Sequence, residues 1–145
     1  MSDLNSTLDV PRGDIRPRSF SRAFWEATRD KKFLLQFDPR SGKHQFFPRA
    51  ASIFDGGTLE WREVSGRGML FSYTFVHRAP PPFRGHEPFV IGVVTLEEGV
   101  NVMANIAHVQ RDDLVIGMPM RLLWAPLPNG THQFLFEPDR ARSGA

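Results

Sequence analysis

The stretch "GMLFSYTFVHR", residues 68–78, decides the fold, because its side chains alternate in character along the chain. One face carries Phe71, Tyr73, Phe75 and His77. The other face carries Leu70, Ser72, Thr74, Val76 and Arg78. An alternation with a period of two residues is typical of a β-strand whose two faces meet different surroundings. Because the second face includes small polar residues, we expect the aromatic face to point into the interior of a barrel.

Four further strands follow this one, and residues that favour turns separate them. We expect these strands at residues 88–99, 100–107, 118–126 and 131–138. Glu98-Gly99 reads as a tight turn, and Asn129-Gly130 is a strong hairpin signal. Residues 79–87 are predicted to form a loop, since three consecutive prolines remove three hydrogen-bond donors that a sheet would need.

The order of these elements selects the kind of barrel. Between the third and fourth strands, residues 108–118 show no clear period and predict a turn or a single helical turn. Five strands with one such connection have the element order of a five-stranded Greek-key barrel, the OB-fold. On strand count alone, an SH3-like barrel or a small sandwich stays open. We therefore expect a mainly β chain in which residues 63–138 form an OB-like barrel.

The two ends of the chain have a different character. Residues 1–18 are polar and broken by proline and glycine, which predicts a flexible arm, and residues 139–145 predict a polar tail. Residues 19–33 predict a helix on which Phe20, Phe24 and Trp25 expose a large apolar surface. That surface must pack on the chain's own domain or on another chain. The three rings are therefore candidate contacts of a partner.

The bulk composition excludes several classes of protein. The 145 residues include no cysteine, so disulfides and thiolate metal sites are ruled out. A net charge of +2 is too small to indicate a nucleic-acid-binding protein. No apolar stretch approaches the roughly 20 residues that span a membrane, and the N-terminus has no apolar signal core. We therefore expect a soluble cytoplasmic protein.

Residues 38–55, "DPRSGKHQFFPRAASIFD", contain two short polar knuckles that mirror each other. The first is Asp38-x-x-Ser41 and the second is Ser52-x-x-Asp55, and each is followed by glycine. Paired knuckles of this spacing build tetrahedral metal sites, but two carboxylates and two hydroxyls are poor ligands for zinc. The residues alone leave three interpretations open: a metal site, the remains of one, or two ordinary turns.

Several motifs in order resemble the DUF35 family over roughly residues 20–138. The motifs are "FWEATRDKKFLLQ", "FFPR", "LEWREVSGRGMLFSYTFVHRAPPPF", "PFVIGVVTLEEG" and "IGMPMRLLW". Members of this family carry an N-terminal helical segment, a rubredoxin-like zinc ribbon and a C-terminal OB-fold. The resemblance lays the ribbon on residues 34–62 and its four cysteine positions on Asp38, Ser41, Ser52 and Asp55. It therefore implies a degenerate ribbon without zinc, which we expect phenylalanines and turn hydrogen bonds to fasten.

The resemblance also implies a function. DUF35 proteins are similar in being non-catalytic scaffold subunits that associate with thiolase-like or other acyl-CoA enzymes in lipid metabolism and help to enclose the acyl-CoA. We therefore expect an acyl-CoA enzyme as the partner, no tightly bound cofactor, and coenzyme A or acyl-CoA only in the complex. Homodimerisation through the helix stays open. The alternatives are an OB-fold nucleic-acid-binding module and an independent small enzyme.

Candidate site residues are few. None of the five histidines has a second histidine three or four residues away, and no nucleophile–base motif is found, so we predict no catalytic residue. The planar fork of arginine suits the phosphates of coenzyme A. The candidate coenzyme A contacts are Arg67, Arg78 and Arg84, together with His77, Phe83 and His86 in and beside the proline-rich loop.

Overall fold

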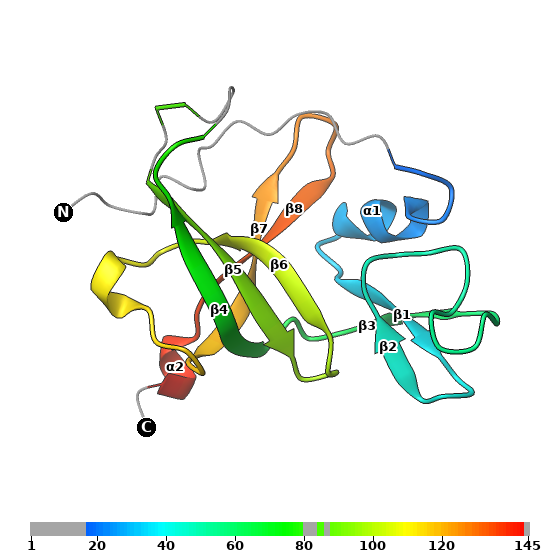
Figure 1. Cartoon of the computed structure of the whole chain (residues 1–145). Coiled ribbons are helices and arrows are strands. Elements are labelled where there is room, and N and C mark those ends of the chain that lie inside the picture. The colour runs from blue at the N-terminus through cyan, green and yellow to red at the C-terminus, as the bar shows by residue number, and fades with distance from the viewer. Residues whose placement is uncertain (1–16, 80–83, 86–87, 144–145) are drawn as a thin grey trace.

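A closed five-stranded barrel forms the larger part of the molecule (Figure 1). The computed structural model describes residues 17–79, 84–85 and 88–143. The barrel strands are β4 (Gly68–Val76), β5 (Phe89–Leu96), β6 (Asn101–Ile106), β7 (Pro119–Pro126) and β8 (His132–Pro138). They follow the spatial order β4-β5-β6-β8-β7, in which β6 and β8 run parallel and the other neighbours antiparallel. This order confirms the predicted OB-fold barrel.

A three-stranded antiparallel sheet precedes the barrel and lies beside it in Figure 1. Its strands are β1 (Leu34–Asp38), β2 (Lys43–Gln45) and β3 (Glu60–Glu63), in the order β2-β1-β3. These strands fall in the segment that the sequence assigns to a zinc-ribbon-like unit, and we call them the ribbon. The two knuckles lie at the β1–β2 turn and in the long loop between β2 and β3.

The N-terminal helix is shorter than the sequence suggested. Residues 19–33 were expected to be helical, but α1 spans Arg22–Thr28. The helix ends because the chain reverses at Lys31, which has a positive φ of 56°, and enters β1 soon afterwards. Phe24 and Trp25 are buried in the chain's own core, which leaves them little free surface for a partner. Phe20, before the helix, is 38% exposed.

An aromatic cluster joins helix, ribbon and barrel into one core. Phe24 of α1 packs edge-to-face on Phe33, and its ring centroid lies 5.9 Å from that of Phe134 in β8. Phe46, from the loop after β2, lies 5.9 Å from the same Phe134 ring. Edge-to-face contacts at these distances are favourable beyond the apolar area they bury. The small ribbon therefore shares its core with the barrel.

Strand β4 changes phase at a β-bulge between Leu70 and Ser72. Before the bulge Leu70 points inward and is 1% exposed, whereas after it Tyr73 and Phe75 pack against the core. Phe71 sits at the bulge itself and is 60% exposed. The prediction that the aromatic face lies wholly inside the barrel is therefore wrong for Phe71, because one extra residue reverses the alternation.

The remaining connections are short. A single 3-10 turn, η2 (Arg111–Asp113), lies between β6 and β7 and agrees with the predicted helical turn. The predicted polar tail begins instead with a buried Asp139 and a short helix, α2 (Arg140–Ser143). The Asp139 N–H donates to the Pro119 carbonyl oxygen at 3.0 Å, and this hydrogen bond attaches the start of the predicted tail to β7. In the part of the chain described, no helix has the length and apolar character that a membrane span requires.

Candidate functional site: the degenerate ribbon and its surroundings

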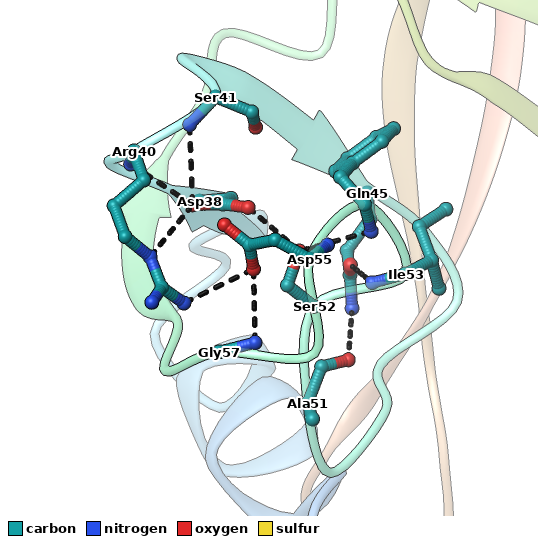
Figure 2. Close-up of polar contacts among 10 residues, drawn as sticks. Asp38, Arg40, Ser41, Gln45, Ala51, Ser52, Ile53, Asp55 and Gly57 are labelled. Atoms are coloured by element: carbon teal, nitrogen blue, oxygen red, sulfur yellow. Dashed lines mark hydrogen bonds and ion pairs between the residues drawn. The ribbon is translucent and has the colours of Figure 1, made fainter.

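Asp38, at the first knuckle, is the centre of a hydrogen-bond network (Figure 2). Its side chain is fully buried at the end of β1. The Ser52 hydroxyl, from the second knuckle, donates to Asp38 Oδ2 at 2.7 Å. The backbone N–H groups of Arg40 and Ser41 donate to Asp38 Oδ1 at 2.9 and 3.3 Å. The side chains at two of the four knuckle positions are thus hydrogen-bonded directly to each other.

The second knuckle is organised in the same manner. Ser52 Oγ accepts hydrogen bonds from the N–H groups of Phe54 at 3.1 Å and Asp55 at 3.4 Å. Asp55 Oδ1 accepts from the Gly57 N–H at 2.9 Å. Serine and aspartate favour such local bonds to backbone groups two or three residues further on. The turn hydrogen bonds that the sequence suggested are therefore present in both knuckles.

Arg40 places a positive charge between the two knuckles. Its Nη2 lies 3.0 Å from Asp55 Oδ1, and its Nε lies 3.9 Å from Asp38 Oδ1. Figure 2 shows the guanidinium reaching from the first knuckle towards the second. Arg40 precedes a ligand position and is not one itself, so the knuckle spacing gave no reason to single it out.

The network holds Asp38 in its ionised form. The hydrogen bond from Ser52 is the largest cause, and together with the backbone N–H groups of Arg40 and Ser41 it outweighs burial. The pKa of Asp38 consequently falls from 3.8 to about 2. A carboxylate that accepts several hydrogen bonds is stabilised in the charged state.

These residues do not fit a structural zinc ion. Zinc prefers thiolate and imidazole ligands in a closed tetrahedral set. Here Asp38 and Ser52 are bonded to each other, Asp55 is paired with a guanidinium, and Ser41 is exposed. Within residues 17–79, 84–85 and 88–143, no three His, Asp or Glu side chains gather into a metal-binding group.

Two buried glutamines fasten the loop that follows β2, and sequence reasoning missed them. Gln45 Nε2 donates to Gln36 Oε1 at 2.9 Å, and Gln45 Oε1 accepts from the Ile53 N–H at 2.9 Å. Gln36 bonds both backbone groups of Arg49 at 2.8 Å. The only signal in the sequence was a glutamine beside apolar residues in each case, Gln36 within "FLLQF" and Gln45 before "FF".

The phenylalanines of the ribbon have separate roles. Phe46 packs in the shared core, and Phe37 lies under the Arg62 guanidinium at 3.6 Å. Phe47 and Phe54 are 46% and 42% exposed, and Ile53 is 58% exposed. Phe46 thus fastens the ribbon as expected of its phenylalanines, whereas Phe47 and Phe54 leave much of their surface exposed.

The candidate coenzyme A contacts do not form one cluster. Arg67 precedes β4 and Arg78 follows it, so the nine residues of that strand, a length of about 30 Å, separate them. Arg67 also lies 3.6 Å from Glu97. Arg78 and Arg84 are exposed at the other end of β4, and His77 is exposed beside Phe75. Phe83 and His86 lie outside the described residues.

A second polar cluster, which the sequence did not suggest, closes the barrel near α2. The Glu137 carboxylate bonds His108 Nδ1 and accepts from Arg121 Nε at 2.7 Å. Burial raises the pKa of Glu137, but the bonds to His108 and Arg121 outweigh it and leave the pKa lowered. The cluster pairs a buried charge with two partners, which is the usual requirement for keeping such a charge.

Comparisons with known proteins agree with this architecture. Residues 61–125 match the family model described as the C-terminal OB-fold domain of ChsH2. The chain is 39% identical over 143 residues to the "3-oxo-4,17-pregnadiene-20-carboxyl-CoA hydratase alpha subunit" of Mycobacterium tuberculosis, which covers 95% of this chain and 44% of that protein. The chain is also 28% identical over 110 residues to a "DUF35 domain-containing scaffold protein" of Pyrococcus furiosus. This alignment covers 74% of this chain and 79% of that protein.

A solved structure resembles most of this chain. The Ltp2-ChsH2(DUF35) aldolase is similar with a TM-score of 0.75 and 25% identity, over 85% of this chain and 98% of that chain. The chain spans less than half of the length of the hydratase subunits that it matches. Barrel, ribbon and motif order all lead to one family. The chain belongs to the DUF35 family, with oxygen-bearing side chains in place of the cysteines of its ribbon.

Proposed function

We propose that this chain is a non-catalytic accessory subunit of a thiolase-like or other acyl-CoA-processing enzyme. The observation that carries the proposal is the likeness to a chain of the Ltp2-ChsH2(DUF35) aldolase, which covers 85% of this chain and 98% of that chain. The names of the M. tuberculosis hydratase subunit and of the P. furiosus scaffold protein support it. A likeness over most of the chain favours a shared role. A likeness of the barrel alone would not, since one fold serves many functions.

The polar clusters support a role without catalysis. Between described residues, no histidine ring bonds a serine or threonine hydroxyl, which is the arrangement that activates such a nucleophile. The Asp38 network is closed on itself, and Glu137 is occupied by His108 and Arg121. Both clusters therefore have structural roles.

Coenzyme A contact is part of the proposal for one end of the barrel. Arg78 and Arg84 are exposed there, and exposed guanidinium groups suit phosphates. Arg67, at the other end and beside Glu97, is the matched control. In the assembled enzyme, Arg78→Ala with Arg84→Ala should raise the Kd for coenzyme A by at least about tenfold, whereas Arg67→Ala should leave it unchanged. Equal effects of both changes would remove this part of the proposal.

The experiment for the function itself begins with affinity capture of the full chain from an extract of its source organism. Mass spectrometry should identify an acyl-CoA enzyme that then co-elutes with the purified chain at a fixed stoichiometry. Recovery of no such enzyme would contradict the proposal. Metal analysis of the same preparation tests the ribbon separately, for which we propose zinc far below one ion per chain.

A further inference from the structure

The outer face of β4, β5 and β6 is a continuous surface without charge. Strand register defines it, because residues opposite each other in an antiparallel pair point to the same side. Val93 pairs with Ser72 on one side and with Met103 on the other, and all three point outward. None of the residues in 69–74, 91–95 and 101–105 is charged, although charged residues make up 23% of the chain.

Large apolar side chains stand out from this surface. Met69 is 50% exposed, Phe71 60% and Met103 67%. The bulge in β4 turns Phe71 outward, so the exposure of this ring follows from the backbone of the strand. Bulges that redirect a side chain are designed features of sheets. Exposed Phe and Met on strand segments that carry no charged residue have the composition of the core of a protein interface.

The surface extends at both edges. Beyond β4, Val115 and Ile116 are 62% and 58% exposed, and Gly117 N–H donates to the Leu70 carbonyl oxygen, which holds this loop beside the bulge. Beyond β6, Met103 also lines a groove of about 570 Å³. Phe20 and Phe47 line the same groove and are 38% and 46% exposed. Helix, ribbon and barrel thus contribute to one apolar surface.

We propose that the uncharged outer face of β4–β6, together with the adjoining groove, binds the acyl-CoA enzyme subunit. The inference rests on the proposed function, which requires a protein surface for that subunit. The enzyme face that fits it is apolar and uncharged, with a protruding side chain that enters the groove. Single-stranded nucleic acid fits less well, since a stacking platform for bases needs a row of basic residues along its groove. The outer face of β4–β6 has no basic residue, and among the described residues that line the groove only Arg18 is basic.

The test uses full-length variants and the purified acyl-CoA enzyme that the wild-type chain captures. Phe71→Glu and Met103→Glu place a charge at the middle of the surface and should each weaken binding by at least about tenfold. Ile53→Glu is the matched control, because Ile53 is 58% exposed on the ribbon and is not among the residues that line the groove, so this variant should bind as the wild type does. Phe71→Met should restore affinity to within about threefold of the wild type, since it returns apolar area without charge. Circular dichroism and the Tm of each variant verify folding.

Other outcomes overturn the inference in distinguishable ways. Unchanged affinity of Phe71→Glu and Met103→Glu, with loss in Ile53→Glu, would move the interface to the ribbon and leave the proposed function standing. A wild-type dimer that Phe71→Glu converts to a monomer, with enzyme binding unaffected, would make a second copy the occupant. Binding to single-stranded DNA that Met103→Glu abolishes would make nucleic acid the occupant. Capture of no acyl-CoA enzyme would remove function and inference together.

Discussion

Asp38 shows how single residues hold a ribbon in which no thiolate is available. Metal ligation stabilises small ribbons strongly, by roughly 10 kcal/mol in isolated peptides. Here the buried Asp38 carboxylate accepts from Ser52 and from two backbone N–H groups, and Arg40 supplies the positive charge. In place of thiolate ligands, the knuckles have several hydrogen bonds, each of modest individual value. The remaining stabilisation comes from the core that the ribbon shares with the barrel.

Ser52→Ala tests the direct bond between the two knuckles. Removing the hydroxyl leaves buried Asp38 Oδ2 without its 2.7 Å partner. The free energy of unfolding should fall by about 1–3 kcal/mol, the cost of an unsatisfied buried polar group. Ser41→Ala is the control from the same set of former ligand positions, because Ser41 is exposed and should change stability by less than about 0.5 kcal/mol. Chemical denaturation measures the free energy of unfolding of both variants. Equal losses would contradict a stabilising role of the bond between Ser52 and Asp38.

The acid sensitivity of the fold tests the charge on Asp38. Its folded-state pKa of about 2 lies below the ordinary 3.8, so the carboxylate stabilises the fold fully above about pH 4 and loses this contribution as pH falls towards about 2. The stability of the wild type should therefore decline more steeply across this window than that of Asp38→Asn, which cannot titrate. Ser52→Ala should show an intermediate slope, because it removes the largest cause of the shift. Parallel slopes in all three proteins would show that Asp38 titrates normally.

The knuckle positions were predictable from sequence, whereas their chemistry was predictable only in part. Spacing identified the four former ligand residues, and the turn preferences of Ser and Asp indicated local hydrogen bonds. The role of Arg40 was not predictable. Nothing in a linear pattern indicates that its flexible guanidinium pairs with Asp55, which lies 15 residues further along the chain. The buried pair of Gln36 and Gln45 depends likewise on the folded path of the loop.

At the scale of elements, strand β4 determines which aromatic side chains reach the core. Its bulge places Leu70 inside and Phe71 outside. Leu70→Ala should destabilise the protein by about 2–5 kcal/mol, as expected for a buried leucine. Phe71→Ala should change the free energy of unfolding by about 0.5 kcal/mol or less, as for other surface changes. Urea titrations of the two neighbouring variants compare them directly, and a larger loss for Phe71→Ala would contradict the bulge.

Elements bounded by strong turn residues were predicted well. The Glu98-Gly99 and Asn129-Gly130 turns fixed the hairpins. The three prolines of the predicted loop at residues 79–87 lie outside the described residues. The bulge escaped prediction because no glycine marks it in "GMLFSYTFVHR". Helix α1 was predicted too long, because Lys31 is a good helix former whose positive φ is imposed by the turn into β1.

At the scale of the whole molecule, one helix ties the ribbon to the barrel. Thr28, fully buried at the end of α1, accepts from the His132 N–H through Oγ1 at 3.0 Å, and its carbonyl oxygen lies 2.7 Å from His132 Nδ1. The Arg29 guanidinium donates to the Asn129 carbonyl oxygen in the β7–β8 turn. Together with Phe24 in the aromatic cluster, these bonds make the helix part of the barrel as much as of the ribbon.

Ribbon and barrel should therefore unfold as one cooperative unit. Phe24 contacts Phe33 at the start of the ribbon and Phe134 in β8, so opening either unit exposes the same core. Native-state hydrogen exchange should give amides of β1 and β8 the same opening free energy, equal to the global value. Phe24→Ala should lower both together by about 3–5 kcal/mol, whereas Phe54→Ala, an exposed ring on the ribbon, should lower neither. Faster exchange in β1 alone would show that the ribbon opens independently of the barrel. Helix, ribbon and barrel would then not form one cooperative unit.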